Sequence, residues 1–341
     1  MRFPSSLLRI FSFSLVLLTA GPVLADRVVN VYTARHYDTD DQLYERFTAQ
    51  SGIEVNLIEG SADELLTRLR REGELSPADV FIAVDAGRLH KAVEQGVLQP
   101  MASEVLEKRI PTNLRHPDGL WFGLSKRARV ILLAEDAPSQ YVTTYEQLAD
   151  PRLEGELLIR SSRNIYNQSL VASLIAHHGV DETQAWAEGV VSNFARRPQG
   201  GDTDQIRALA AGEGRVAVAN HYYFARMLAG DDASDRDAAS KLRLVFPNQD
   251  GRGTHVNLSG AGVVKSAPNR AEAVALLEFF TTEEAQSIYA VANHEYPVVD
   301  GVELSPVLER LGEFKEDPLN ASELGDHNRE AVRVMDRAGW R

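Results

Sequence analysis

The chain has 341 residues and a formal net charge of −13 at pH 7, and 44% of its residues are hydrophobic. This acidity argues against nucleic acid and against an anionic membrane surface as partners. Because the chain contains no cysteine, thiolate ligands, thiolate nucleophiles and disulfide bonds are excluded, so the fold has to rely on the size of its apolar core.

The first 25 residues have the layout of a secretory signal peptide. Arg2 and Arg9 flank a polar start, residues 10–18 are almost wholly apolar, and residues 23–25 supply small side chains for cleavage. The apolar run is too short to span a bilayer, which disfavours a membrane anchor. We therefore predict export and cleavage, leaving a mature chain from Asp26 that is not inserted in the membrane and carries a net charge of −15, since only two arginines are lost.

The segment that follows alternates between strand and helix patterns. Capping groups at residues 38–40 and the capping box from Ser61 to Glu64 mark two helix starts. This rhythm predicts a mostly parallel sheet with right-handed crossovers. The predicted strands are 28–32, 53–58 and 79–84, and the predicted helices lie between 38 and 52, from 61 through 69, and at 86–94.

The alternation breaks between Trp121 and Glu135. Two strand-like runs, 120–124 and 128–133, are separated by Ser-Lys-Arg at 125–127, with no helix between them. Such a pair of strands can cross from one lobe to another, and the length of the chain also favours two lobes. The predicted N-terminal lobe comprises residues 26–127 and 253–303, and the predicted C-terminal lobe comprises 128–252 and 304–341.

The alternation then resumes to the end of the chain. The run 256–264 is interpreted as the return to the first lobe, and residues 281–284 form a predicted capping box. The fold class predicted from this pattern is α/β. Further strands are predicted at 156–160, 215–219 and 242–246, and further helices at 166–178, 182–195, 203–211, 271–280, after 281 and near 328–337.

Tyrosines follow several of the predicted strands. Tyr222 and Tyr223 lie at a strand-to-helix corner, His36 and Tyr37 follow the first strand, and Tyr166 follows the strand at 156–160. Ligands collect at the carboxyl ends of strands in open α/β sheets, so these rings are predicted to meet in a cleft. The alternative for the Tyr222 and Tyr223 pair is that one ring packs in the core and the other lies on the surface.

Phenols are poor ligands at neutral pH, because their pKa is near 10. A trivalent cation stabilises the phenolate, three or four phenolates would roughly cancel a 3+ charge, and hard oxygens suit iron(III). Arg35, Arg127, Arg129 or Arg163 could offset excess phenolate charge or hold a small anion. The common motifs for nucleotide binding, hydrolysis and zinc catalysis are missing, so nothing nominates a nucleophile. A protein that only binds and releases a metal ion makes and breaks no covalent bond, and on this ground we predict that it is not an enzyme.

In combination, six segments resemble periplasmic ferric-iron-binding proteins, the substrate-binding components of iron ABC importers. The resemblance implies a type II periplasmic-binding-protein fold, with two α/β lobes, a hinge and a ligand cleft between them. It also implies iron(III) ligation by His36, Tyr37, Tyr166, Tyr222 and Tyr223. The matching segments are 32–37, 77–81, 125–130, 164–170, 220–223 and 259–262.

One branch of that family holds iron with one His, one Glu, two Tyr and an exogenous anion. Those relatives have the Glu just after the third strand, where this chain has Asp85, and a small-residue anion loop where this chain has Tyr166. The chain therefore resembles the tyrosine-rich branch. Asp85 is interpreted as a helix N-cap, with metal ligation as the alternative, and His36 either ligates or only hydrogen-bonds nearby. Bicarbonate or another small anion joining the shell is left open.

The implied function is capture of ferric iron in the periplasm and its delivery to an inner-membrane ABC permease and its ATPase, by a protein that is expected to be a monomer. Two alternatives stand beside it. One is a binding protein for an organic cation or other small solute, with Tyr and Trp faces lining the cleft. The other is a secreted hydrolase with a divalent metal, for which no cluster of carboxylates or histidines is found.

Overall fold

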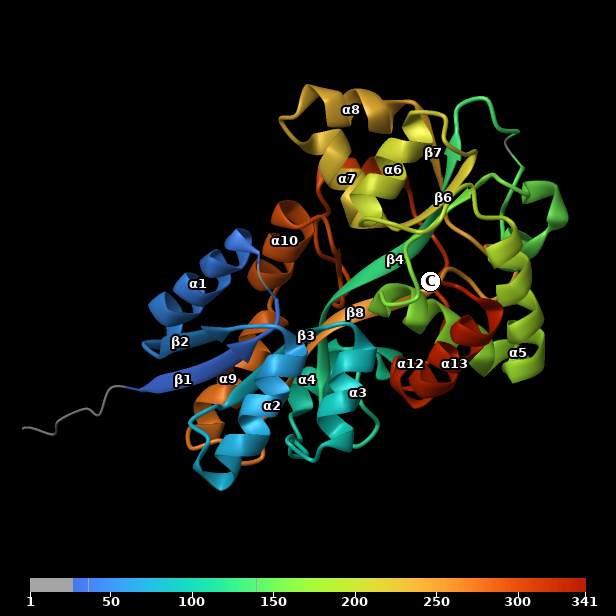
Figure 1. Ribbon diagram of the computed structural model, residues 1–341. Coiled ribbons are helices and arrows are strands. Elements are labelled where there is room, and N and C mark those ends of the chain that lie inside the picture. The colour runs from blue at the N-terminus through green and yellow to red at the C-terminus, as the bar shows by residue number, and fades with distance from the viewer. Residues whose placement is uncertain (1–26, 36, 139) are drawn as a thin grey trace, which may run out of the picture.

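The computed structural model describes residues 27–35, 37–138 and 140–341. The predicted signal peptide, residues 1–25, and His36 therefore lie outside the described residues. The chain forms a mixed α/β structure in which helices surround a curled sheet in two parts, and the strand β4 runs from one part into the other (Figure 1). Among the described residues, no helix is both long enough and apolar enough to cross a bilayer.

The N-terminal part of the sheet begins with three parallel strands, as the alternation predicts. β1 pairs in parallel with β2 and β3, and β8 then pairs antiparallel with β3. Ser61 caps the second helix in a capping box with Glu64, and Asp85 caps the third by accepting from the Gly87 amide, so both predicted caps are confirmed. The strands are β1 (Val28–Thr33), β2 (Glu54–Glu59), β3 (Val80–Val84) and β8 (Val256–Val263), and the helices are α1 (Asp41–Ser51), α2 (Ala62–Glu72), α3 (Ala86–Glu94), α4 (Glu104–Arg109), α9 (Arg270–Phe280) and α10 (Glu283–Ala292).

One continuous strand, β4 (Phe122–Ala134), joins the two parts of the sheet. The prediction of two separate strands at 120–124 and 128–133 was wrong. Ser125 and Arg127 look like a turn in the sequence, but both are buried within the strand and hydrogen-bond to Glu295 and Ser259. Because the Ser125 hydroxyl and the Arg127 Nη2 find hydrogen-bond partners inside the protein, these polar residues can be buried in a strand that continues through them.

The C-terminal part of the sheet is built on the second half of β4. β6 and β7 pair antiparallel with β4, and β5 pairs in parallel with β6. The two helices predicted at 166–178 and 182–195 form α5, whose halves meet at Gly179, where φ is 79°. The strands here are β5 (Leu157–Leu158), β6 (Val216–Asn220) and β7 (Leu242–Val245), and the helices are α5 (Ile165–Ser192), α6 (Asp202–Ala210), α7 (His221–Ala229), α8 (Ala233–Ser240), α11 (Pro306–Leu311), α12 (Ser322–Asp326) and α13 (Asn328–Ala338). The short strand β9 (Tyr296–Pro297) pairs antiparallel with Ser125 and Lys126 in the first half of β4.

The apolar residues of β4 supply two cores in this part of the molecule. Ile131 and Leu133 pack into one cluster, whereas Val130 and Leu132 pack into another on the opposite face of the sheet. This division follows from the two-residue period of a strand, and burial on both faces explains the continuous apolar run. A third cluster lies around β1, β3 and β8. The lobe boundaries given above remain predictions.

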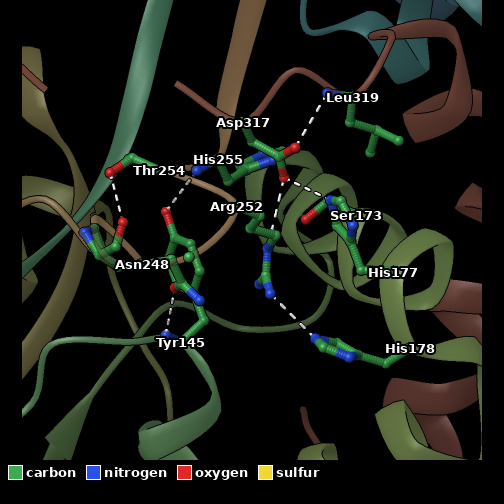
Figure 2. A network of polar contacts seen from close by, with 12 residues as sticks. Tyr145, Ser173, His177, His178, Asn248, Arg252, Thr254, His255, Asp317 and Leu319 are labelled. Atoms are coloured by element: carbon green, nitrogen blue, oxygen red, sulfur yellow. Dashed lines mark hydrogen bonds and ion pairs between the residues drawn. The ribbon is translucent and has the colours of Figure 1, made fainter. Parts of the chain in front are cut away.

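A polar network fixes the chain where it enters β8 (Figure 2). The Tyr145 hydroxyl donates to the Arg129 carbonyl oxygen and accepts a hydrogen bond from the His255 amide at 3.1 Å. Arg252 pairs with Glu146, and its Nε lies 3.6 Å from Asp317. The segment that leads into β8 is therefore held by side chains from several other parts of the chain.

The His255 imidazole in this network predicts a pH-dependent stability. Burial, together with the charges of Arg129 and Arg252, lowers the pKa of His255 to about 3. Between the ordinary value near 6.5 and about 3, the unfolded chain binds a proton that the folded chain does not, so the free energy of unfolding falls as the pH falls. His255→Gln should weaken this dependence by an amount on the order of 3 kcal/mol between pH 7 and pH 3, measured by urea denaturation. As a control, the stability of both proteins is first compared at pH 7, which separates any loss caused by the substitution itself from the change in pH dependence. If the free energy of unfolding depends on pH equally in the wild type and in His255→Gln, the lowered pKa is wrongly assigned to His255.

Close packing against β8 gives a second prediction. A Cβ added at Gly262 would lie 2.4 Å from the Leu120 carbonyl oxygen, so Gly262→Ala should lower the free energy of unfolding by about 1–3 kcal/mol. A Cβ at Gly251 would meet nothing closer than 3.7 Å, and Gly251→Ala is the matched control. Both variants are compared by urea denaturation, and equal stabilities would show that the chain at Leu120 can move away from β8 without cost.

Candidate metal centre

Two of the predicted tyrosines lie at the amino end of α7. β6 ends at Asn220 and α7 begins at His221, so Tyr222 and Tyr223 belong to the first turn of the helix instead of preceding it. Their ring centroids are 4.3 Å apart at an angle of 31°. Tyr222 is fully buried and Tyr223 is half-buried, and the helix N-terminus favours negative charge on their oxygens.

Tyr166 reaches the same place from the first turn of α5. Asn164 caps this helix by accepting from the Tyr166 amide at 3.1 Å, which fixes the backbone at that point. The Tyr166 and Tyr222 hydroxyl oxygens are 3.3 Å apart. Two phenols that are 56 residues apart in the sequence therefore share one hydrogen bond.

Tyr37 joins them from the segment after β1. The Arg226 guanidinium carbon lies 4.7 Å from the centre of the Tyr37 ring and 4.9 Å from that of Tyr222, so one cation lies against both rings. Arg35 lies 4.5 Å from the Tyr37 ring. The structure thus brings together four of the five predicted residues, and the fifth, His36, lies outside the described residues. Sequence analysis missed Arg226, although its position one turn after Tyr222 on α7 is a signal for it.

Burial and neighbouring side chains raise the pKa of three of these phenols, Tyr37, Tyr222 and Tyr223. Burial raises the pKa of Tyr222 well above its usual value, and the neighbouring Tyr166, Tyr37 and Tyr223 raise it further. The pKa values of Tyr37 and Tyr223 are raised in the same way, first by burial. All three phenols are therefore neutral at pH 7, and only a strong positive charge placed among them would make them ionise.

Arg127 supplies part of the positive charge. It is almost fully buried, its Nη2 donates to the Ser259 Oγ at 2.6 Å, and its charge lowers the pKa of both Tyr222 and Tyr37. Its Nε and Nη1 have no hydrogen-bond partner in the described part of the chain. Buried donors are normally paired, so these two are free for an anion or a phenolate oxygen.

A buried ion network lies next to these rings. Arg35 pairs with Asp40 and with Glu295, each at 2.6 Å, and Glu295 Oε1 lies 3.9 Å from Arg127. Burial raises the pKa of Glu295, but the charges of Arg35 and Arg127 lower it more, so that it lies at about 2. Sequence analysis missed this carboxylate, because nothing in its local pattern marks it as buried. Asp40, predicted as a capping group, makes no side-chain cap hydrogen bond and is part of this network.

The other two predicted arginines are placed differently. Arg129 is buried and its guanidinium is paired with Asp202 at 2.7 Å and with Asn167 at 2.8 Å, 6.0 Å from the Tyr166 ring. Arg163 is exposed and lines a separate surface hollow. Among the described residues, no group of three or more His, Asp or Glu is placed to hold a metal ion.

Two α/β parts joined by strands, with a cluster of polar rings between them, define a solute-binding protein of the two-lobed type. Comparison with known proteins agrees with this class. Residues 76–311 match the family model described as bacterial extracellular solute-binding protein, and the chain belongs to this family.

The relatives are iron-handling proteins by name. The chain is 52% identical to iron uptake protein A1 of Synechocystis sp. over 92% of this chain and 87% of that protein. Its fold is similar to that of the Trichodesmium protein IdiA (FutA) in complex with iron and citrate, with a TM-score of 0.90, 52% identity and coverage of 92% of this chain and 100% of that one. The ferric binding protein of Campylobacter jejuni is 40% identical with a TM-score of 0.86, over 92% of this chain and all of that chain. The resemblance to periplasmic ferric-iron-binding proteins and the two-lobed α/β fold are therefore confirmed.

Proposed function

We propose that this protein captures iron(III) in the periplasm through the phenolates of Tyr37, Tyr166, Tyr222 and Tyr223, with His36 as a further ligand. The observation that carries the proposal is the convergence of four phenols from three separate parts of the chain, with two of their hydroxyls 3.3 Å apart. The relatives named for iron uptake and ferric iron support the choice of cargo.

Charge explains why the cargo would be a trivalent ion. Each bound phenolate contributes one negative charge, and nearby Arg127 and Arg226 favour ionisation of the rings. The ion then acidifies the phenols as it acidifies metal-bound water, so binding releases protons. The unpaired Nε and Nη1 of Arg127 would offset any excess phenolate charge or hold a small anion such as bicarbonate.

Transport follows from the fold. The protein would be made with a signal peptide over residues 1–25, act as a monomer without catalysing a reaction, and pass iron to an inner-membrane permease with its ATPase. Closure of the lobes would hold the ion, and opening, protonation or reduction would release it. Reduction assists because hard phenolates suit iron(II) less well than iron(III).

The alternative of an organic cation in the same cleft is less well supported. Arg35, Arg127 and Arg226 already place positive charge against the tyrosine rings, and an organic cation would not ionise the phenols to offset it.

The test is a titration of metal-free protein with ferric citrate. One equivalent of iron should produce a phenolate-to-iron charge-transfer band in the visible spectrum, and metal analysis after desalting should give one iron per chain. The unfolding temperature should also rise with iron loading, because the ion binds only the folded cleft. A colourless, metal-free product would refute the proposal.

A further inference from the structure

A buried hydrogen bond joins the start of α5 to the N-terminal part of the fold. The Ser169 hydroxyl of α5 donates to Asp85 Oδ1 at 2.7 Å, although the two residues are 84 positions apart in the sequence. Both residues are fully buried. Asp85 follows β3 and caps α3, whereas Ser169 comes three residues after Tyr166 on α5. The hydrogen bond therefore reaches the helix that carries one of the proposed iron ligands.

Asp85 makes more contacts than a helix cap requires. The cap itself is the hydrogen bond that Oδ1 accepts from the Gly87 amide at 2.9 Å. In addition, Oδ2 accepts from the Asn257 side chain of β8 at 2.9 Å, and the Asp85 amide donates to the Leu258 carbonyl oxygen at 2.8 Å. The residue therefore links α3, β8 and α5, whereas a cap alone would involve only α3.

The backbone of Asp85 has an uncommon conformation. Its φ is 87°, a positive value that residues other than glycine seldom adopt. Such a conformation persists where the surrounding contacts fix it, and residues of this kind cluster at ligand-binding sites. The hydrogen bonds to Ser169, Asn257 and Leu258 supply those contacts here, so the carboxylate is held in one orientation.

These contacts also separate two roles for Asp85 at the candidate metal centre. Oδ1 already accepts two hydrogen bonds and Oδ2 accepts one, and the residue has no exposed surface. Direct ligation of a metal ion would break this pairing and leave buried donors without partners, which costs free energy. An indirect role, exerted through Ser169, keeps every one of these hydrogen bonds.

The first turns of α3 and α5 also pack directly against each other. A Cβ added at Gly87 would lie 3.3 Å from Ile165 Cδ1, so the two helices approach closely where α3 has no side chain. Ile165 is buried and immediately precedes Tyr166. Together with the hydrogen bond at Ser169, this contact holds α5 on both sides of Tyr166 in the sequence.

We propose that Asp85 is a positioning residue for iron(III), which acts through Ser169 to hold the first turns of α5 so that the Tyr166 oxygen reaches the other phenols. The inference rests on the proposed function, in which Tyr166 is a ligand. Asp85 follows β3 as Tyr37 follows β1, whereas the other three phenols lie on α5 and α7. The hydrogen bond thus fixes a phenol of the C-terminal part relative to the N-terminal part, and metal affinity depends on outer partners of this kind.

The test is Ser169→Ala, which removes the hydrogen bond to α5 and adds no volume, so the variant should fold. Iron affinity, measured by competition of the metal-free protein with a ferric chelator, should fall at least about tenfold. The phenolate-to-iron band should also shift, because Tyr166 would bind in an altered geometry. The matched control is Ser173→Ala. Ser173 is buried one turn later on α5, and its hydroxyl donates to the Leu170 carbonyl oxygen of the same helix, so this variant should keep the wild-type affinity and band.

A double variant shows whether Ser169 acts through Tyr166. Tyr166→Phe alone should weaken iron binding, and adding Ser169→Ala to it should change the affinity by less than about twofold, because the ring that is positioned no longer has its oxygen. A purely structural role of Ser169 would instead weaken binding by the same factor in both backgrounds. Circular dichroism and the unfolding temperature of each metal-free variant would verify that it is folded.

Two outcomes would overturn the inference. One is a Ser169→Ala protein with wild-type affinity and an unshifted band, and the other is an equal loss of affinity with and without the Tyr166 hydroxyl. Both leave the proposed function in place, because the wild type would still show its iron band. A wild type without the band, or a Tyr166→Phe protein with full affinity, would refute the ligand assignment itself, and the positioning role would fall with it.

Discussion

Tyr222→Phe is expected to remove or shift the visible charge-transfer band of the iron-loaded protein and to weaken iron binding by at least about 100-fold. Losing a partner one shell further out typically costs a metal site 10–100-fold in affinity, and loss of a ligand should cost no less. Tyr222 is the fully buried member of the cluster, its hydroxyl lies 3.3 Å from that of Tyr166, and its ring contacts Tyr223 and Arg226. Competition of the metal-free variant with a ferric chelator would give the affinity.

The matched control is Tyr141→Phe. The Tyr141 hydroxyl donates to Glu156 and lies outside the cluster, so this variant also loses one phenol but should keep both band and affinity. Wild-type colour and affinity in Tyr222→Phe would remove this residue from the ligand set.

Glu295→Gln is expected to lower the free energy of unfolding of the metal-free protein by about 3–5 kcal/mol, the usual cost of breaking a buried ion pair by removing one partner. The Glu295 carboxylate is fully buried, lies 2.6 Å from Arg35 Nη1 and accepts from the Ser125 hydroxyl at 2.8 Å. Without its charge, Arg35 would keep Asp40 as its one ion-pair partner among the residues that the structure describes, and buried Arg127 would lose its nearby carboxylate.

Urea denaturation measures this loss, and the control is Glu303→Gln. Glu303 is exposed, so its substitution should change stability by no more than about 0.5 kcal/mol. A Glu295→Gln protein as stable as the control would mean that water reaches these arginines in solution and that the network is not closed.

Local sequence patterns were sufficient to predict most of the helices and strands. The parallel strands β1, β2 and β3, the capping box at Ser61 and the cap at Asp85 all lie where the sequence predicts them. Each of these features depends on residues within a few positions of one another, and for that reason a single sequence is enough to find them.

The candidate site was predictable only in part. Tyr37, Tyr166, Tyr222 and Tyr223 follow strands, and strand ends meet at one edge of a sheet, so their convergence could be predicted from order alone. The residues that set the charge around the tyrosine cluster could not be predicted. Glu295 meets Arg35 across 260 positions of sequence, and no local pattern carries information at that separation.

The sequence by itself determined the α/β alternation, the helix caps at Ser61 and Asp85 and the placing of tyrosines at strand ends, because backbone periodicity and capping are short-range properties. The tertiary structure decided that Ser125 and Arg127 continue β4 instead of breaking it, and that Arg226 lies against Tyr37 and Tyr222. Whether a polar group can be buried depends on partners that only folding brings within reach, and the free energy of that pairing is absent from any local pattern.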